Sequence, residues 1–247
     1  MSEESLFVGA RWVDGDWVTV AMDASGFVDA GVLDGVGDLW YRHEDRARRI
    51  LVDVPIGLPD EGVDPRQCDD LARSVLGERG DALLEPPVRE ATRKQRHATG
   101  TRVHERTVDR ELSEAAFARS DGIAAVDELL AELPEARPVV AESHPEVCFR
   151  AFAGEPMGHG PDTAGGYAER LRALSEYDRD APPVLVEVGE ALGGHAATVG
   201  DALAALALAY TARPGTADLR TLPPDPPTDD RGLPMGIHYR AETPLVA

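Results

Sequence analysis

The chain has 247 residues, 43% of them apolar, which is enough to bury the core of one large domain. Its formal net charge is −20, and Lys94 is its one lysine beside many arginines. We interpret this composition as adaptation to molar salt, as in a halophile, because a Debye length of about 3 Å screens most self-repulsion there. The acidity argues against a nucleic-acid partner without excluding one. No segment has the composition of a signal peptide or a membrane span, so we expect a cytoplasmic protein with Cys68 and Cys148 as free thiols.

The N-terminal third has the pattern of three strands, a helix and a fourth strand. We predict strands over residues 5–11, 17–22 and 27–33. The turn between the first two contains Asp-Gly, which favours the positive φ of a hairpin. Residues 37–48 are predicted as a helix. Residues 50–56 are a nearly continuous apolar run interrupted by Asp53, which is typical of a buried central strand.

The remainder is mostly helical. A helix is predicted over residues 65–76, with Asp64 as its N-cap. Further helices are predicted over 88–98, 107–133, 144–153 and 167–177, and a strand is predicted over 138–142. Residues 201–212 are apolar on every side, which indicates a buried helix. Residues 214–234 are rich in Pro and Asp and are predicted as a loop, followed by a closing strand over 235–240. The chain is thus an α/β protein with one domain, 1–247, carrying a helical insertion at about 63–134 and that loop at about 214–234.

Three carboxylates occupy places where a site could form. Asp53 lies at the end of the apolar strand, Glu142 ends the strand over 138–142, and Asp201 begins the buried helix. Strand ends and helix starts meet at one edge of an open α/β sheet, and oxygen ligands there select Mg²⁺ or Mn²⁺. Each residue also has a structural interpretation. Asp53 could accept backbone amides, Glu142 could pair with an arginine, and Asp201 fits a capping box with Thr198.

Other polar side chains have weaker signals. His144 could take part in proton transfer or only cap the next helix, and Glu146 suits the first turn of that helix. Arginines on two adjacent helices could bind phosphate, although salt bridges to the many acids are the commoner fate; they are Arg66, Arg73, Arg79, Arg89, Arg93 and Arg96. Of these we take Arg66, Arg73 and Arg89 as the substrate-binding candidates. Cys148 lies on an apolar helix face and is interpreted as core.

Several segments in a fixed order carry a family resemblance. They are DVPIGLP at 53–59, RQCD at 66–69, LGER at 76–79, PPVR at 86–89, ESHPEV at 142–147 and DAL at 201–203. In this order they resemble the DUF429 family, described as predicted nucleases with a ribonuclease-H-like fold. The resemblance implies a mixed sheet with a β-β-β-α-β core, then the helical insertion, a parallel strand and a C-terminal buried helix. It also implies an acidic metal site formed by the first strand, the Asp53 and Glu142 strands and the last helix.

The sequence departs from that family at two acidic positions. Ala10 stands where the first strand usually carries an Asp, and Ala204 stands where the last helix usually carries a second one. A basic residue before Thr163 is absent as well. The loss of the first-strand acid removes a ligand expected to bridge two metal ions.

Two functions follow from this pattern. One is a metal-dependent nuclease in which Asp53, Glu142 and Asp201 hold Mg²⁺ or Mn²⁺ and His144 moves a proton. The other is a catalytically inactive relative, monomer or homodimer, that binds nucleic acid, a nucleotide or a protein. A phosphotransferase of the actin-like group is disfavoured because it needs two such domains. If Arg11 forms a salt bridge into the carboxylate cluster, its guanidinium replaces the cation and favours the inactive relative; the hypothesis fails if Arg11 points to solvent.

Overall fold

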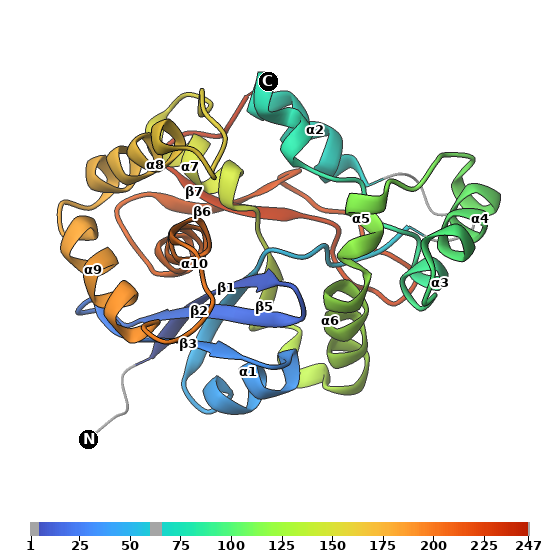
Figure 1. The fold of residues 1–247 in the computed structure, drawn as a ribbon, viewed down its shortest axis with the longest axis horizontal. Helices are drawn as coiled ribbons and strands as arrows, with labels where there is room; N and C mark the ends of the chain where they lie inside the picture. Colours follow the sequence, from blue (N-terminus) through green and yellow to red (C-terminus); the bar gives the residue numbers. More distant parts are fainter. Residues whose placement is uncertain (1–4, 60–65, 247) are drawn as a thin grey trace.

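Five strands form a central mixed sheet in the order β3-β2-β1-β4-β5 (Figure 1). The computed structural model describes residues 5–59 and 66–246. Three strands form an antiparallel meander, β1 (Leu6–Val13), β2 (Asp16–Met22) and β3 (Phe27–Leu33). Two more add parallel pairs: β4 (Ala47–Val52) pairs with β1, and β5 (Val140–Glu142) pairs with β4. The predicted α/β class with a mixed sheet is confirmed, and the strand order is compatible with a ribonuclease-H-like fold.

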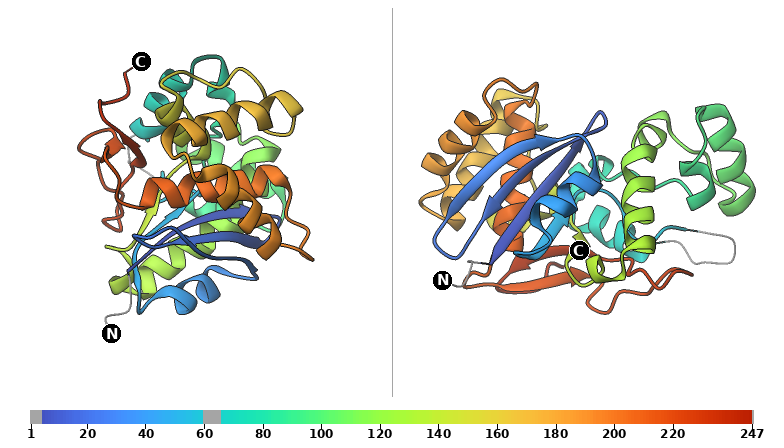
Figure 2. Two further views of the ribbon diagram at one scale, coloured as in Figure 1. Left: turned by 90° about the vertical axis from the view of Figure 1, so that its left-hand side faces the viewer. Right: turned by 90° about the horizontal axis from the view of Figure 1, so that it is seen from below.

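Helices cover both faces of this sheet. On one face lies α10 (Val199–Ala212), which packs on β1, β2 and β4 and is itself covered by α7 (Pro145–Ala153), α8 (Ala164–Tyr177) and α9 (Ala181–Ala191) (Figures 1 and 2). The other face packs against α1 (Val36–His43) and α6 (Ser120–Glu132). The predicted buried helix is therefore confirmed: every residue from Ala202 to Ala212 is buried.

Small residues set the distance between α10 and the sheet. A Cβ built on Gly9 of β1 would lie 2.1 Å from the Ala205 carbonyl oxygen and 2.3 Å from the Ala209 nitrogen. Backbone atoms cannot move aside as a flexible side chain can, so glycine at this position lets the helix lie directly on the strand. The alanines of α10 have the same effect from the other side of the contact.

The insertion between β4 and β5 consists of shorter helices than the sequence predicted. They are α2 (Gln67–Leu76), the 3₁₀ turn η1 (Gly77–Ala82), α3 (Arg89–Thr92), α4 (His97–Val108), α5 (Glu114–Ala118), α6 and the 3₁₀ turn η2 (Pro134–Ala136). The predicted helices over 88–98 and 107–133 were wrong in extent. Extended backbone at Arg96 divides the first, and Asp109 in the left-handed region, with Ser113 capping α5, divides the second. The predicted cap Asp64 lies outside the described residues.

Three further boundaries differ from the sequence prediction. The helix predicted over 37–48 ends at His43, because Ala47 already pairs with Leu6 of β1. Helix α9 was missed, since Pro182 and Pro183 open this helix instead of preventing it. The predicted loop over 214–234 contains β6 (Asp218–Leu222), which pairs with β7 (Ile237–Ala241) in a separate two-stranded sheet. One bridge, from Ser143 to His238, links β7 to the end of β5.

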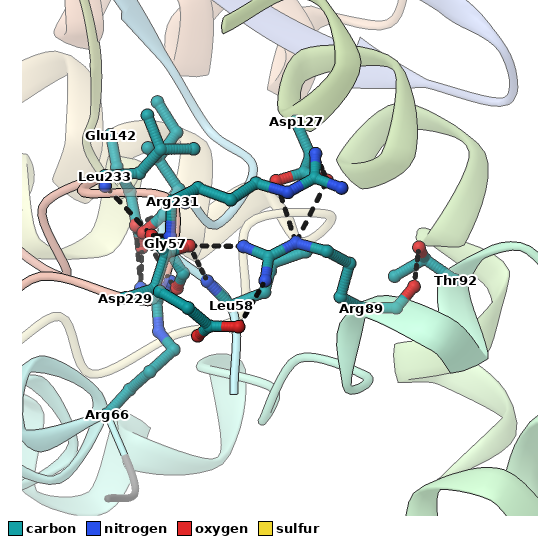
Figure 3. A network of polar contacts seen from close by, with 12 residues as sticks. Gly57, Leu58, Arg66, Arg89, Thr92, Asp127, Glu142, Asp229, Arg231 and Leu233 are labelled. Atoms are coloured by element: carbon teal, nitrogen blue, oxygen red, sulfur yellow. Dashed lines mark hydrogen bonds and ion pairs between the residues drawn. The ribbon is translucent and has the colours of Figure 1, made fainter. Parts of the chain in front are cut away.

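A buried ionic network fixes the insertion against the core (Figure 3). Arg89 of α3 pairs with Asp127 of α6 at 3.2 Å and with Asp229 of the Pro/Asp-rich segment. Asp229 also accepts the backbone N–H groups of Leu58, at 3.1 Å, and Leu233, at 2.9 Å. Four separate parts of the chain are therefore held together by charge-assisted bonds inside the protein, where water screens them little.

Two further features concern the apolar helices and the cysteines. Among the described helices, none combines the length and apolar character that a bilayer crossing requires. Cys68 and Cys148 are both buried and unpaired, as predicted.

We predict that Gly9→Ala lowers the free energy of unfolding by about 3 kcal/mol, because the added methyl group meets helix backbone. The measurement is urea unfolding in molar KCl. Gly31→Ala in β3 is the matched control, since a Cβ there meets nothing within 4 Å. Equal stability of the two variants would contradict this account of the packing of α10.

Candidate functional site

An arginine connects two of the predicted site carboxylates. Arg11 of β1 forms a salt bridge with Asp53, and its Nε lies 3.7 Å from Oδ1 of Asp201 at the start of α10. The salt bridge raised as a hypothesis from the sequence is therefore present. A guanidinium lies between the two acids, where a metal-dependent site would have a cation.

Asp53 is held as a carboxylate by this arrangement. Its side chain is 0% exposed, and it accepts the Trp12 N–H at 2.8 Å while Arg119 of the insertion lies 3.4 Å away. Burial acts to raise the pKa of Asp53, but Arg11, Arg119 and the Trp12 N–H together outweigh it and lower that pKa. Asp53 in turn raises the pKa of Arg11, against the opposing effect of burial.

Asp201 has the structural role that the sequence left open. Its Oδ2 accepts the Thr198 N–H at 3.0 Å, and its own N–H donates to Oγ1 of Thr198 at 3.2 Å. This is the predicted capping box, which stabilises the first turn of α10. Its Oδ1 remains, and it faces Arg11.

Glu142 pairs with Arg66 of the insertion (Figure 3). Its oxygens accept from Nη2 of Arg66 at 2.6 and 2.7 Å, and one of them also accepts the Ile56 N–H at 2.7 Å. Burial raises the pKa of Glu142, and Arg66 opposes the rise by favouring the charged form. Arg66 also donates to the carbonyl groups of Ile56 and Gly57 and pairs with Asp69. It has no donor left over for a phosphate, so its predicted substrate contact gains no support.

These contacts decide whether the carboxylates fit Mg²⁺ or Mn²⁺. The oxygens of Asp53 and Glu142 already accept from arginines and backbone N–H groups, and one oxygen of Asp201 is used by the cap. Within residues 5–59 and 66–246, no group of three or more His, Cys, Asp or Glu side chains is arranged to hold a metal ion. The donor set does not fit a divalent cation, because the charge that a cation would balance is already balanced by guanidinium groups.

The remaining predicted substrate-binding arginines lie away from these acids. Arg73 is partly exposed and pairs with Asp70 at 3.0 Å on the surface of α2. Arg89 belongs to the buried network with Asp127 and Asp229. Neither lines the pocket described next.

A pocket of about 290 Å³ opens beside Arg11 and Asp53, between the start of α10, the ends of β4 and β5, and the insertion. Its charged and polar wall includes Arg79, Arg119, His144 and Glu146, and its apolar wall includes Leu83, Leu84, Ile123 and Phe149. The four residues predicted from the sequence as catalytic all line this pocket; they are Asp53, Glu142, His144 and Asp201.

Several buried polar atoms on this wall lack hydrogen-bond partners in the described part of the chain. They are Nε of Arg11, Nε of Arg79, Nδ1 of His144 and Oε2 of Glu146. Two of these atoms have an oppositely charged neighbour beyond hydrogen-bond distance. Nε of Arg11 lies 3.7 Å from Oδ1 of Asp201, and Nε of Arg79 lies 3.8 Å from Oε2 of Glu146. Unsatisfied buried polar atoms are costly, so their concentration at one cavity indicates a place where a polar ligand completes the bonding.

Comparison with known proteins adds a family to this geometry. The model of the family described as "Protein of unknown function (DUF429)" matches residues 13–229. The chain belongs to the DUF429 family. No curated protein and no solved structure matches it.

Of two arginines in the pocket of this DUF429 protein, the sequence analysis singled out Arg79 but not Arg119. Arg79 lies in the LGER segment and was one of six candidate arginines. Arg119 was missed. Its Nη2 donates to the Asp53 carbonyl oxygen at 2.5 Å, and its guanidinium lies 5.8 Å from the centre of the Trp12 ring. It is 66 residues from Asp53 in sequence, and no local pattern marks it.

We predict that Arg11→Met lowers the free energy of unfolding by about 3 kcal/mol at neutral pH, because it leaves the buried Asp53 charge with Arg119 alone. Urea unfolding measures this. Arg42→Met is the matched control, since the Arg42–Asp29 pair is exposed and its loss costs about 0.5 kcal/mol. A loss in Arg11→Met no larger than in the control would show that this ion pair is dispensable.

A second prediction concerns pH. Burial, assisted by neighbouring arginines, lowers the pKa of His43 and His144 to about 4. The unfolded chain binds protons at these residues from about pH 6.5, while the folded chain stays neutral there until near pH 4. Stability therefore falls as the pH decreases across this range. In thermal melts His43→Phe should flatten that fall, and an unchanged slope would refute the assignment.

Proposed function

We propose that this DUF429 protein binds a phosphate-bearing ligand in the pocket, and that arginine side chains take the place of a metal ion. The observation that carries the proposal is the position of Arg11 between Asp53 and Asp201. With the carboxylates neutralised, the pocket keeps further guanidinium groups that can serve a ligand. Arginine forks match the geometry of phosphate oxygens and remain charged at any physiological pH.

The available donors support this proposal. Nε of Arg79 has no hydrogen-bond partner within the described residues, and Oε2 of Glu146 is 3.8 Å from it. The bonds of Arg119 to Asp53 use Nη2, which leaves the rest of its guanidinium for other partners. Helices α7 and α10 both begin at the pocket, and the side chain of His144, the cap residue of α7, does not cap it. Helix starts carry partial positive charge, which favours an anion.

The competing function is the metal-dependent nuclease, with Asp53, Glu142 and Asp201 as Mg²⁺ or Mn²⁺ ligands and His144 in proton transfer. The nuclease function rests on the family resemblance. The carboxylates do not support it, because arginines and backbone N–H groups already occupy their oxygens. Nucleic acid remains a partner to test, because a nucleotide and the end of a nucleic-acid strand share phosphate chemistry. We also propose that the protein works in the reducing cytoplasm of a halophile. The net charge of −20, the one lysine and the two free thiols support this.

Binding is tested by calorimetric titration of adenosine monophosphate into the protein in molar KCl with a chelator. We expect binding without a divalent cation, and a loss of about tenfold or more in Arg79→Met, because a hydrogen bond to a charged group is removed. Arg73→Met is the matched control, a nearby arginine outside the pocket. Binding that needs Mg²⁺, or equal loss in both variants, would contradict the proposal.

Cleavage is tested on single- and double-stranded DNA and RNA with Mg²⁺ or Mn²⁺ present, in the wild type and in Asp53→Asn. We expect no cleavage by either protein. Cleavage by the wild type that disappears in Asp53→Asn would establish the nuclease and replace the function proposed here.

A further inference from the structure

The pocket contains hydrogen-bond acceptors as well as arginine donors. Glu146 uses Oε1 to accept from Arg170, at 2.6 Å from Nη2 and 3.0 Å from Nε. Its Oε2 is buried and lacks a hydrogen-bond partner among the described residues. The oxygens of a fully ionised phosphate monoester are acceptors only, so such a group offers this carboxylate oxygen no donor.

His144 supplies a second acceptor two residues away. Burial, with Arg119 nearby, lowers its pKa to about 4, so its ring is neutral at pH 7 and carries one N–H. A hydrogen bond with the Ala82 backbone acts to raise the pKa of His144, as expected when a ring N–H donates to a carbonyl group. Nδ1 is buried and has no partner in the described part of the chain. With the ring N–H directed at Ala82, Nδ1 presents a lone pair.

From these two acceptors we infer that the ligand carries a hydroxyl or amino donor beside its phosphate, and that His144 and Glu146 bind that donor. This inference rests on the proposed function, because the arginines of the same pocket would bind the phosphate. Small-molecule sites span about 300–1,000 Å³, and this pocket, at about 290 Å³, lies just below that range. The ligand class is therefore a small phosphorylated polyol or nucleoside.

The polar and apolar walls agree with a ligand of this kind. Arg11, Arg79 and Arg119 provide the anion side, and the two acceptors lie at the start of α7. Leu83, Leu84 and Ile123 give a surface for carbon atoms between polar groups. A site that hydrogen-bonds a hydroxyl group discriminates strongly against an analogue that lacks it, because its own buried groups are then left unpaired.

The test compares glycerol phosphate with propyl phosphate, which share charge and carbon number and differ in hydroxyl groups. We expect the wild type to bind glycerol phosphate at least about tenfold more tightly. His144→Phe and Glu146→Gln should each reduce this preference, because each variant removes an acceptor that only the hydroxyl groups of glycerol phosphate would use. His43→Phe, which removes another buried histidine that does not line the pocket, should retain the preference.

The outcomes separate this inference from the proposed function. Equal binding of the two phosphates by the wild type would overturn the inference and leave phosphate binding standing. Binding of neither would remove the proposed function itself. The tautomer of His144 is a readout that does not depend on variants folding. Nitrogen NMR should find Nδ1 unprotonated in the free protein and shifted when glycerol phosphate binds, and a protonated Nδ1 would overturn the inference.

Discussion

The charge of one buried carboxylate, Asp53, has to be compensated, and the site depends on how this is done. Asp53 follows a central strand and has no exposed side-chain surface. An isolated carboxylate in such a place is very costly, so a metal ion or a basic side chain must lie beside it. Here Arg11, on the neighbouring strand, provides the charge and reaches Asp201 as well. That one interaction joins the sheet to the start of α10, and it takes the place in which a divalent cation would be coordinated.

The rest of the fold positions this charge pair. Gly9 lets α10 lie directly on the sheet, which brings Asp201 to the edge where Asp53 follows β4. The insertion lines the other side of the pocket with Arg119, and the pair of Arg89 with Asp229 fixes the insertion against the rest of the chain. Four residues on the pocket wall, Arg11, Arg79, His144 and Glu146, each have a buried polar atom without a hydrogen-bond partner in the described part of the chain. Arg89, Asp127 and Asp229 of the ionic network have no such atom. This contrast between neighbouring parts of one protein is the basis for assigning a ligand to the pocket.

The sequence predicted the architecture well and the chemistry of the site only in part. The strand pattern, the buried helix and the capping box at Asp201 are local features, since hydrophobic periodicity and cap residues are visible within a short window. Asp53 stood out because a carboxylate interrupts an apolar run. The partners of Glu142 and Asp53 could not be predicted in the same way. Arg66 and Arg119 come from the insertion, and the direction in which a long arginine side chain points is decided by tertiary packing. The helices of the insertion were also misjudged, because Asp109 and Ser113 end and begin helices within what reads as one helical stretch.

The central claim is that a guanidinium group, and no metal ion, balances the carboxylates at this edge of the sheet. A crystal structure from crystals grown with Mn²⁺ in molar KCl, with anomalous diffraction recorded at the manganese edge, tests it most directly. The account predicts that Arg11 contacts Asp53 and Asp201 and that the anomalous map is empty between them. A manganese peak bound by Asp53, with Arg11 displaced toward solvent, would contradict it.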